Sequence, residues 1–115
     1  MAENIAPEPS YFTIPDLVKR FSLTPGKVHR LIEDNYLAAV RVDGVLSVPA
    51  EFVQGTEPLP PLRGTLLVLL DAGFTRDESI DWLFAVNEEL GERPIDSLMA
   101  GRKSAVRRAT QALAF

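Results

Sequence analysis

The sequence predicts a mainly α-helical fold that contains one small β-hairpin. Three observations support this prediction. Apolar residues recur at helical spacing along most of the chain, threonines and prolines stand where helices would begin, and one short stretch alternates apolar and polar residues around an Asp-Gly pair. With 115 residues, the chain is long enough for one compact domain, or for two very small ones that share a core.

The first helix is expected from Ile14 to Phe21. Thr13 precedes it, and Asp16 follows at the spacing of a capping box, in which each side chain accepts a hydrogen bond from the other residue's backbone N–H group. Pro15 suits the first turn, because the N–H groups there have no helical partner.

A second helix is expected after a short turn at residues 22–23. Thr24 is a favourable N-cap, and Pro25 fits the first helical position. An apolar stripe at helical spacing follows, and the helix is expected to end near Asp34 or Asn35.

Residues 37–49 are expected to form a β-hairpin. Valines alternate with other residues around Asp43-Gly44, and this pair favours a type I′ turn because both of its positions need a positive φ. Two helices followed by a hairpin are the element order of a winged helix-turn-helix, in which the hairpin forms the wing.

The rest of the chain is expected to form a C-terminal helical bundle. Residues 54–61 contain three prolines and one glycine and are interpreted as a linker. The helices expected beyond it are Leu62–Ala72, a helix capped by Thr75 that carries Trp82 to Phe84, Pro94–Ala100 and Lys103–Ala114. The predicted organisation is a flexible segment at 1–10, a winged helix-turn-helix at 11–53, the linker at 54–61 and the helical domain at 62–115.

The composition excludes several kinds of site. With no cysteine and a single histidine, His29, the chain cannot form disulfides, zinc–thiolate sites or multi-histidine metal sites. The acidic residues between 71 and 89 lie at caps and on exposed helical faces, with no nucleophile or phosphate loop nearby. We therefore expect no enzymatic activity, no catalytic or metal-binding residues, no cofactor and no small-molecule ligand.

The apolar runs are short. The longest, Leu66 to Leu70, has five residues, whereas about 20 are needed to span a bilayer. The first residues lack the basic region and apolar core of a signal peptide. A cytoplasmic protein without membrane contact is expected.

Charge is unevenly distributed along the chain. The net charge of −4 disfavours a polyanionic partner, but basic residues outnumber acidic ones between Lys19 and Arg41, and the acid is concentrated between Asp71 and Asp96. From Gly101 onward there are four basic residues and no acidic one, which we interpret first as solvated surface and second as phosphate contacts. Such local patches are compatible with DNA binding that weakens as salt rises.

The second helix has the features of a DNA-recognition helix. In a helix-turn-helix, the N-terminal residues of this helix reach base edges in the major groove, which requires small residues at the tip and donors beside them. Arg30 can read guanine or hold a phosphate, and Lys27 suits a phosphate. The candidate residues here are Thr24, Pro25, Gly26, Lys27, His29 and Arg30.

Further contacts are expected from helix starts and from the wing. Backbone N–H groups at Thr13 and Thr24 attract phosphates. Arg41 and Gly44 place the wing against the DNA backbone or minor groove, although Asp43 between them would repel phosphate. The ordinary alternative is a pair of packed helices whose basic residues serve only solubility. The hairpin that follows favours DNA binding.

Residues 11–53, YFTIPDLVKRFSLTPGKVHRLIEDNYLAAVRVDGVLSVPAEFV, resemble the winged helix-turn-helix of excisionase-type and MerR-type DNA-binding domains. A capped helix, a Leu-Thr turn, a recognition helix, a strand and a glycine-turn wing follow one another in that order. More closely, residues 11–115 resemble a small actinobacterial family of winged-helix DNA-binding proteins first described in mycobacteria. The resemblance implies double-stranded DNA binding through residues 24–30 and the wing, without enzymatic activity. A transcriptional regulator is the leading hypothesis.

The second half also resembles the helical domain of a class of antitoxins, through a Trp-Leu…Asn…Leu-Gly…Pro…Leu…Gly pattern between Trp82 and Gly101. That resemblance implies dimerisation and partner binding, so a protein-interaction module is the alternative function. Ordinary core and cap roles for the same residues stay open. A homodimer through the C-terminal helices is expected to use the apolar segments Leu66–Leu70 and Leu113–Phe115.

Overall fold

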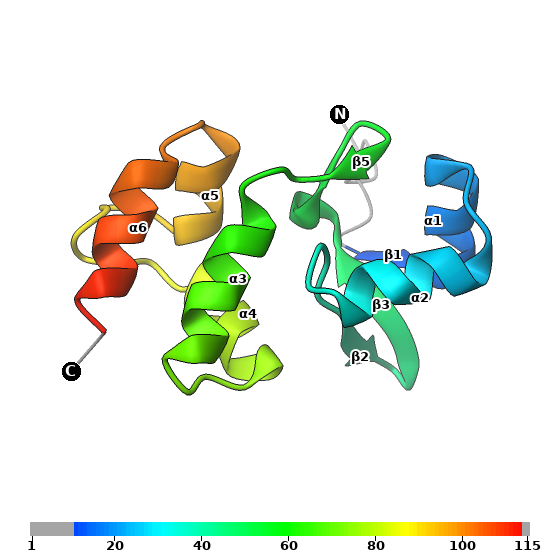
Figure 1. The fold of residues 1–115 in the computed structure, drawn as a ribbon, viewed down its shortest axis with the longest axis horizontal. Helices are drawn as coiled ribbons and strands as arrows, with labels where there is room; N and C mark the ends of the chain where they lie inside the picture. The colour runs from blue at the N-terminus through cyan, green and yellow to red at the C-terminus, as the bar shows by residue number, and fades with distance from the viewer. Residues whose placement is uncertain (1–10, 114–115) are drawn as a thin grey trace, which may run out of the picture.

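Two halves lie side by side in the structure, one built around a small sheet and the other from helices (Figure 1). The computed structural model describes residues 11–113. The predicted fold class is confirmed, since a winged helix-turn-helix is followed by a helical bundle. The flexible segment expected at residues 1–10 lies outside the described residues.

In chain order the elements are β1 (Tyr11–Thr13), α1 (Ile14–Phe21), α2 (Pro25–Glu33), β2 (Val40–Val42), β3 (Val45–Pro49), the short 3-10 helix η1 (Ala50–Phe52), β4 (Val53–Gln54), β5 (Glu57–Pro58), α3 (Leu62–Asp71), α4 (Arg76–Phe84), α5 (Pro94–Met99) and α6 (Lys103–Gln111).

The sheet of the first half has three antiparallel strands in the order β1-β3-β2. Strands β2 and β3 form the predicted hairpin, and Val42 pairs with Val45 across its turn. Asp43 and Gly44 have φ angles of 51° and 81°, as a type I′ turn requires. Strand β1 was not predicted, because three residues are too few to show an alternating pattern. Its pairing with β3 joins the start of α1 to the sheet.

The helices begin at the predicted caps. Thr13 and Asp16 form the capping box of α1, and Thr75 and Glu78 form that of α4. Thr24 caps α2 with its side chain. These hydrogen bonds satisfy N–H groups that a helix leaves without partners, so the local sequence determines where each of these helices starts.

The connection between the two halves is folded, whereas a linker was expected at residues 54–61. Strands β4 and β5 form a second small hairpin. At its turn, Gly55 accepts a hydrogen bond from Nε of Arg20 at 2.7 Å. Leu59 is buried, and its N–H group donates to the carbonyl oxygen of Phe52 at 2.8 Å. The prolines therefore stiffen a packed connection.

In the second half, α3 packs against α4 and α6, and α5 packs against the same two helices. The run Leu66–Leu70 lies in a helix, as predicted. The expectation that it forms a dimer surface is wrong for Leu66 and Leu69, because both side chains are buried within one chain. Leu113 is partly buried against the same core, and residues 114–115 lie outside the described part. Other buried side chains of this bundle are Leu83, Ile95, Leu98 and Val106.

The two halves share one hydrophobic core. Phe52 of η1 is fully buried, and the centroid of its ring lies 5.6 Å from that of Phe84 in α4. Leu17 of α1 and Leu62 of α3 belong to the same cluster. Packing therefore sets the position of the helix-turn-helix relative to the bundle. No helix between residues 11 and 113 is both long enough and apolar enough to cross a membrane.

Candidate nucleic-acid interface

The N-terminal end of α2 lies at the side of the molecule away from the helical bundle (Figure 1). Val28 is fully buried and, with the partly buried Leu31 and Ile32, holds the helix on the core. Opposite this stripe the helix faces solvent. The exposed residues of its cap and first two turns are Thr24, Pro25, Gly26, Lys27, His29 and Arg30, so the structure presents together all six residues that the sequence singled out here.

Gly26 and Arg30 lie four residues apart on the exposed face of α2, which places them one helical turn from each other. Lys27 and His29 flank this face. Glu33 shares the face one turn beyond Arg30 and is also exposed. Its carboxylate would repel a phosphate. The electrostatics therefore favour an anion at the first two turns of α2 and disfavour one at its end.

Packing within the chain does not require a glycine at position 26. A Cβ atom placed there would meet no atom within 4 Å, and the φ of Gly26 is not positive. Glycine nevertheless costs roughly 0.5–1 kcal/mol relative to alanine inside a helix. The missing side chain is explained if a surface outside the chain approaches the helix closely at this point.

The start of α2 also offers a backbone donor. Pro25 has no N–H group, and the N–H group of Lys27 donates to Oγ1 of Thr24 at 3.2 Å. The N–H group of Gly26, at the second helical position, has no acceptor within the helix. It points out of the positive end of the helix dipole, where an anion is stabilised.

The structure argues against the phosphate contact predicted at Thr13. Its N–H group donates to Oδ2 of Asp16 at 2.9 Å, and its Oγ1 accepts from the N–H group of Asp16 at 3.3 Å. The donor is therefore already used, and a carboxylate lies where a phosphate would bind. Because the capping box of α1 uses this N–H group, it is not available to a phosphate. We therefore leave Thr13 out of the interface.

The wing presents one arginine on strand β2, close to its turn. Arg41 is exposed, and its Nη1 donates to the carbonyl oxygen of Gly44 at 3.0 Å, across the turn. A guanidinium group has five N–H donors, so most of them stay available. Asp43 is exposed in the same turn and lowers the positive potential there.

Two arginines of the bundle hold the C-terminal end of α2. Arg63 of α3 donates from Nε to the carbonyl oxygen of Asp34 at 2.9 Å, and Arg76 of α4 donates from Nη2 to that of Glu33 at 3.1 Å. The guanidinium of Arg63 also lies over the ring of Tyr36, 4.7 Å from its centroid. These cations satisfy carbonyl groups that the end of a helix leaves open and complement its negative dipole end. No local sequence pattern indicates these bonds, because the arginines lie 29 and 43 residues from their acceptors.

Arg20, in the basic part of the sequence, has a structural role in this arrangement. Besides its hydrogen bond to Gly55, its guanidinium lies 5.0 Å from the centroid of the Phe12 ring. These contacts tie α1 to β1 and to the β4–β5 turn. The neighbouring Lys19 is exposed on α1.

Comparisons with known proteins agree with this geometry. A family model described as the winged helix-turn-helix domain of DNA-binding protein Rv2175c matches residues 2–53, and a second, described as the Rv2175c C-terminal domain of unknown function, matches residues 59–114. The chain belongs to the Rv2175c family. This confirms the resemblance to a small actinobacterial winged-helix family that the sequence predicted.

Two matches to Rv2175c, one by sequence and one by structure, cover nearly the whole chain. The DNA-binding protein Rv2175c of Mycobacterium tuberculosis is 28% identical over an alignment of 121 positions that covers 94% of this chain and 82% of the relative. The NMR structure of Rv2175c superposes with a TM-score of 0.80 at 26% identity, and the match covers 97% of this chain and 87% of that one. The arrangement of both halves in this chain is therefore similar to that in the solved structure of Rv2175c.

Proposed function

We propose that this protein binds duplex DNA, inserts α2 in the major groove, rests the β2–β3 wing on the flanking backbone, and regulates transcription without enzymatic activity. One observation carries the proposal: the first turns of α2 are exposed, small and flanked by cations, on the side of the molecule away from the bundle. The name of the mycobacterial relative, a DNA-binding protein, supports it. Binding chromosomal DNA would place the protein in the cytoplasm.

The proposed contacts divide into positioning and reading. Arg30, on the exposed face, is suited to bidentate contact with guanine, and His29 beside it to a base edge. Lys27 and Arg41 hold phosphates on either side, while the N–H group of Gly26 donates to another. The residues of the proposed interface are Thr24, Pro25, Gly26, Lys27, His29, Arg30, Arg41 and Gly44.

The electrostatics predict weak and salt-sensitive binding. Three side-chain cations, Lys27, Arg30 and Arg41, face the proposed DNA, against a net charge of −4 for the whole chain. If Lys27 and Arg41 each neutralise one phosphate while Arg30 contacts a base, the logarithm of the binding constant falls with the logarithm of salt concentration with a slope of about −2.

A salt series on paired variants tests the proposal. Binding to a duplex is measured by fluorescence anisotropy between low and physiological salt, for the wild type and for Lys27→Ala with Arg30→Ala. The control, Lys103→Ala with Arg108→Ala, removes one lysine and one arginine from exposed positions of α6. We expect the first pair to abolish most binding and to reduce the magnitude of the slope by about 1, and the control to change neither.

Equal losses in the two double variants would mean that net charge alone attracts DNA, and would contradict the assignment to α2. No binding by the wild type at low salt would favour the alternative that the sequence left open, a module that binds a partner protein. If the wild type binds DNA, selection of bound fragments from genomic DNA would identify its operator.

We also propose that two copies bind adjacent half-sites. One winged helix makes few contacts, whereas a second on the same duplex gains from high effective concentration. Exposed apolar side chains on the bundle are available for the contact: Val86 is 73% exposed and Met99 52%. Sedimentation is expected to show dimers on DNA. Monomers alone at high concentration, both free and on DNA, would contradict this.

A further inference from the structure

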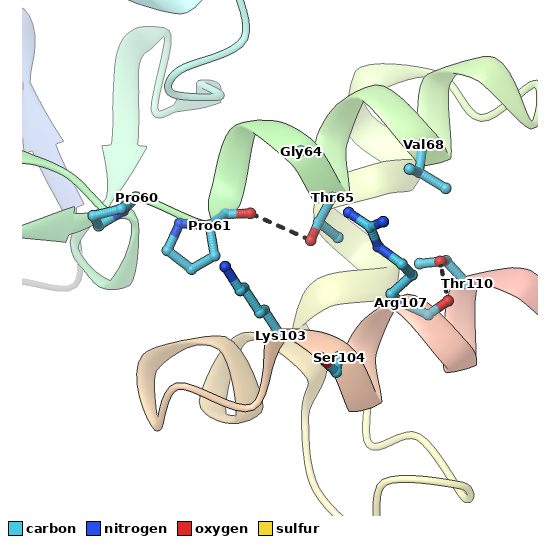
Figure 2. A pocket seen from close by; sticks show the side chains of 9 residues that line it. All are labelled: Pro60, Pro61, Gly64, Thr65, Val68, Lys103, Ser104, Arg107 and Thr110. Atoms are coloured by element: carbon cyan, nitrogen blue, oxygen red, sulfur yellow. Dashed lines mark hydrogen bonds between the residues drawn. The ribbon is translucent and has the colours of Figure 1, made fainter.

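A pocket of about 470 Å³ lies between α3 and α6, in the half of the family described as a domain of unknown function (Figure 2). Its volume lies in the range of small-molecule sites. Pro60 and Pro61 form a rigid apolar wall at one end, and Lys103 and Arg107 form the opposite side. None of these residues belongs to the proposed DNA interface.

The two cations line the pocket from the same helix. Lys103 and Arg107 are four residues apart on α6 and so share a face. In Figure 2 the lysine side chain extends toward Pro61, and the guanidinium of Arg107 lies near Thr65 and Val68 of α3. Within residues 11–113 no acidic side chain lines the pocket, and neither cation forms a salt bridge.

The start of α6 adds to the positive potential. Its N-cap, Arg102, makes no capping hydrogen bond with its side chain, and no acidic residue lies in its first turn. Cations at a helix N-terminus are unfavourable, because the dipole is positive there. Ser104, which also lines the pocket, has an exposed hydroxyl group that can donate a hydrogen bond. A bound anion would neutralise this region.

Across the pocket from α6, helix α3 contributes a glycine, which leaves the pocket open. Gly64 lies in the first turn of α3 and lines the pocket. A Cβ atom there would meet nothing within 4 Å, and the φ of Gly64 is not positive. Neither packing nor backbone conformation therefore requires glycine, and any larger side chain would extend into the pocket.

We propose that this pocket binds a small phosphorylated metabolite. Its phosphate group is held between Lys103 and Arg107 with Ser104 beside it, and its organic part lies against Pro60 and Pro61. The concave shape distinguishes this ligand from DNA, whose convex backbone contacts exposed helix ends and loops. The inference goes beyond DNA binding and stands without it.

Inorganic phosphate is the probe for a first test. The backbone amide signals of the full chain are followed by NMR as phosphate replaces chloride at constant ionic strength. We expect saturable shifts at Gly64, Lys103 and Ser104, with a dissociation constant of about 1–10 mM, which is usual for a fragment of a ligand. Shifts that do not saturate, or that chloride reproduces, would overturn the proposal.

Three variants distinguish phosphate binding in the pocket from non-specific attraction of phosphate by positive charge. Lys103→Ala with Arg107→Ala is expected to weaken phosphate binding at least tenfold, and Arg108→Ala, which removes an exposed cation of α6 outside the pocket, less than twofold. Gly64→Leu retains both cations but places a branched side chain in the pocket opposite them, and is expected to weaken binding at least severalfold. Unchanged affinity in Gly64→Leu, with the native melting temperature, would place the anion on the open surface and overturn the proposal.

A titration with duplex DNA distinguishes the source of the phosphate. The amides of Gly64 and Ser104 are expected to keep their positions when DNA shifts those of α2. If DNA moves the pocket amides and free phosphate does not, the cations of α6 belong to a DNA interface and the small-ligand proposal is wrong. Failure of DNA binding at α2 leaves the phosphate titration unaffected, so the two proposals are tested separately.

Discussion

Nε of Arg63 donates a hydrogen bond to the carbonyl oxygen of Asp34 at 2.9 Å, and so joins the first helix of the bundle to the end of α2. Arg76 makes the equivalent bond to Glu33. Neither arginine belongs to the proposed DNA surface. The bundle thus holds the recognition helix at one end, while the other end is free to meet a ligand.

Arg63→Ala is expected to weaken both folding and DNA binding. The lost hydrogen bond and the lost contact with Tyr36 should lower the free energy of unfolding by about 1 kcal/mol. Since α2 is then held less firmly, DNA affinity should fall severalfold with an unchanged salt slope, because no phosphate contact is removed. Anisotropy across a salt series measures this, with Arg108→Ala as the control. A reduced slope would show instead that Arg63 contacts DNA itself.

Gly26→Ala is expected to change stability and DNA affinity in opposite directions. The added methyl group meets no atom of the chain and favours the helix, so the free energy of unfolding should rise by about 0.5 kcal/mol. The same methyl group would keep the DNA from the tip of α2, and Gly26→Leu should weaken binding further. Thermal unfolding and anisotropy on one preparation give both quantities. Higher stability with full DNA affinity would remove Gly26 from the interface.

Asp43→Asn is expected to strengthen DNA binding. Asn-Gly suits a type I′ turn, so the wing keeps its shape, and the substitution removes a negative charge beside Arg41. The gain should be about threefold at low salt and smaller at high salt, because the effect is electrostatic. Glu88→Gln, an exposed change of equal charge in the other half, is the control. Equal gains in both would mean that only the total charge matters.

Stability is expected to fall in acid through two carboxylates of the bundle. Hydrogen bonds from Ser97 and then Arg102 lower the pKa of Glu92, and the hydrogen bond from Arg93 lowers that of Asp96. A carboxyl group whose pKa is lower in the folded state contributes stability above its unfolded value, about 4, and this is lost as the pH falls through the folded value. Both groups are partly exposed, so the effect should be modest.

Thermal unfolding between pH 7 and pH 3 measures this dependence. Glu92→Gln with Asp96→Asn should have a lower melting temperature at pH 7 and should lose less stability than the wild type as the pH falls. Glu88→Gln should follow the wild type. A double variant with the same pH dependence as the wild type would assign the acid sensitivity to other carboxylates.

The parts of the fold that sequence predicted are those with short-range signals. Thr13 with Asp16, and Thr75 with Glu78, are three residues apart, so their capping boxes can be read directly. The turn at Asp43-Gly44 likewise needs only its own two residues. Six residues of the candidate interface lie in one continuous segment, 24–30, and were identified for the same reason.

Features that depend on contacts between distant segments were not predictable in this way. The prolines of residues 54–61 indicated a linker, and only the burial of Leu59 shows why the segment is folded. Arg63 looked like any surface cation until folding placed it at the end of α2. The phosphate pocket requires Gly64 and Lys103 to face each other from two different helices, and no local pattern reports that.

The shared core and the two arginine bonds also bear on how such a protein evolves. Cutting the chain after Pro61 would expose Phe52 and leave the last carbonyl groups of α2 without donors. The winged helix-turn-helix half of this chain therefore cannot be transferred to another protein as an independent domain. Changes in the second half during evolution had to preserve its contacts with the first, which are made at Phe52 and through Arg63 and Arg76.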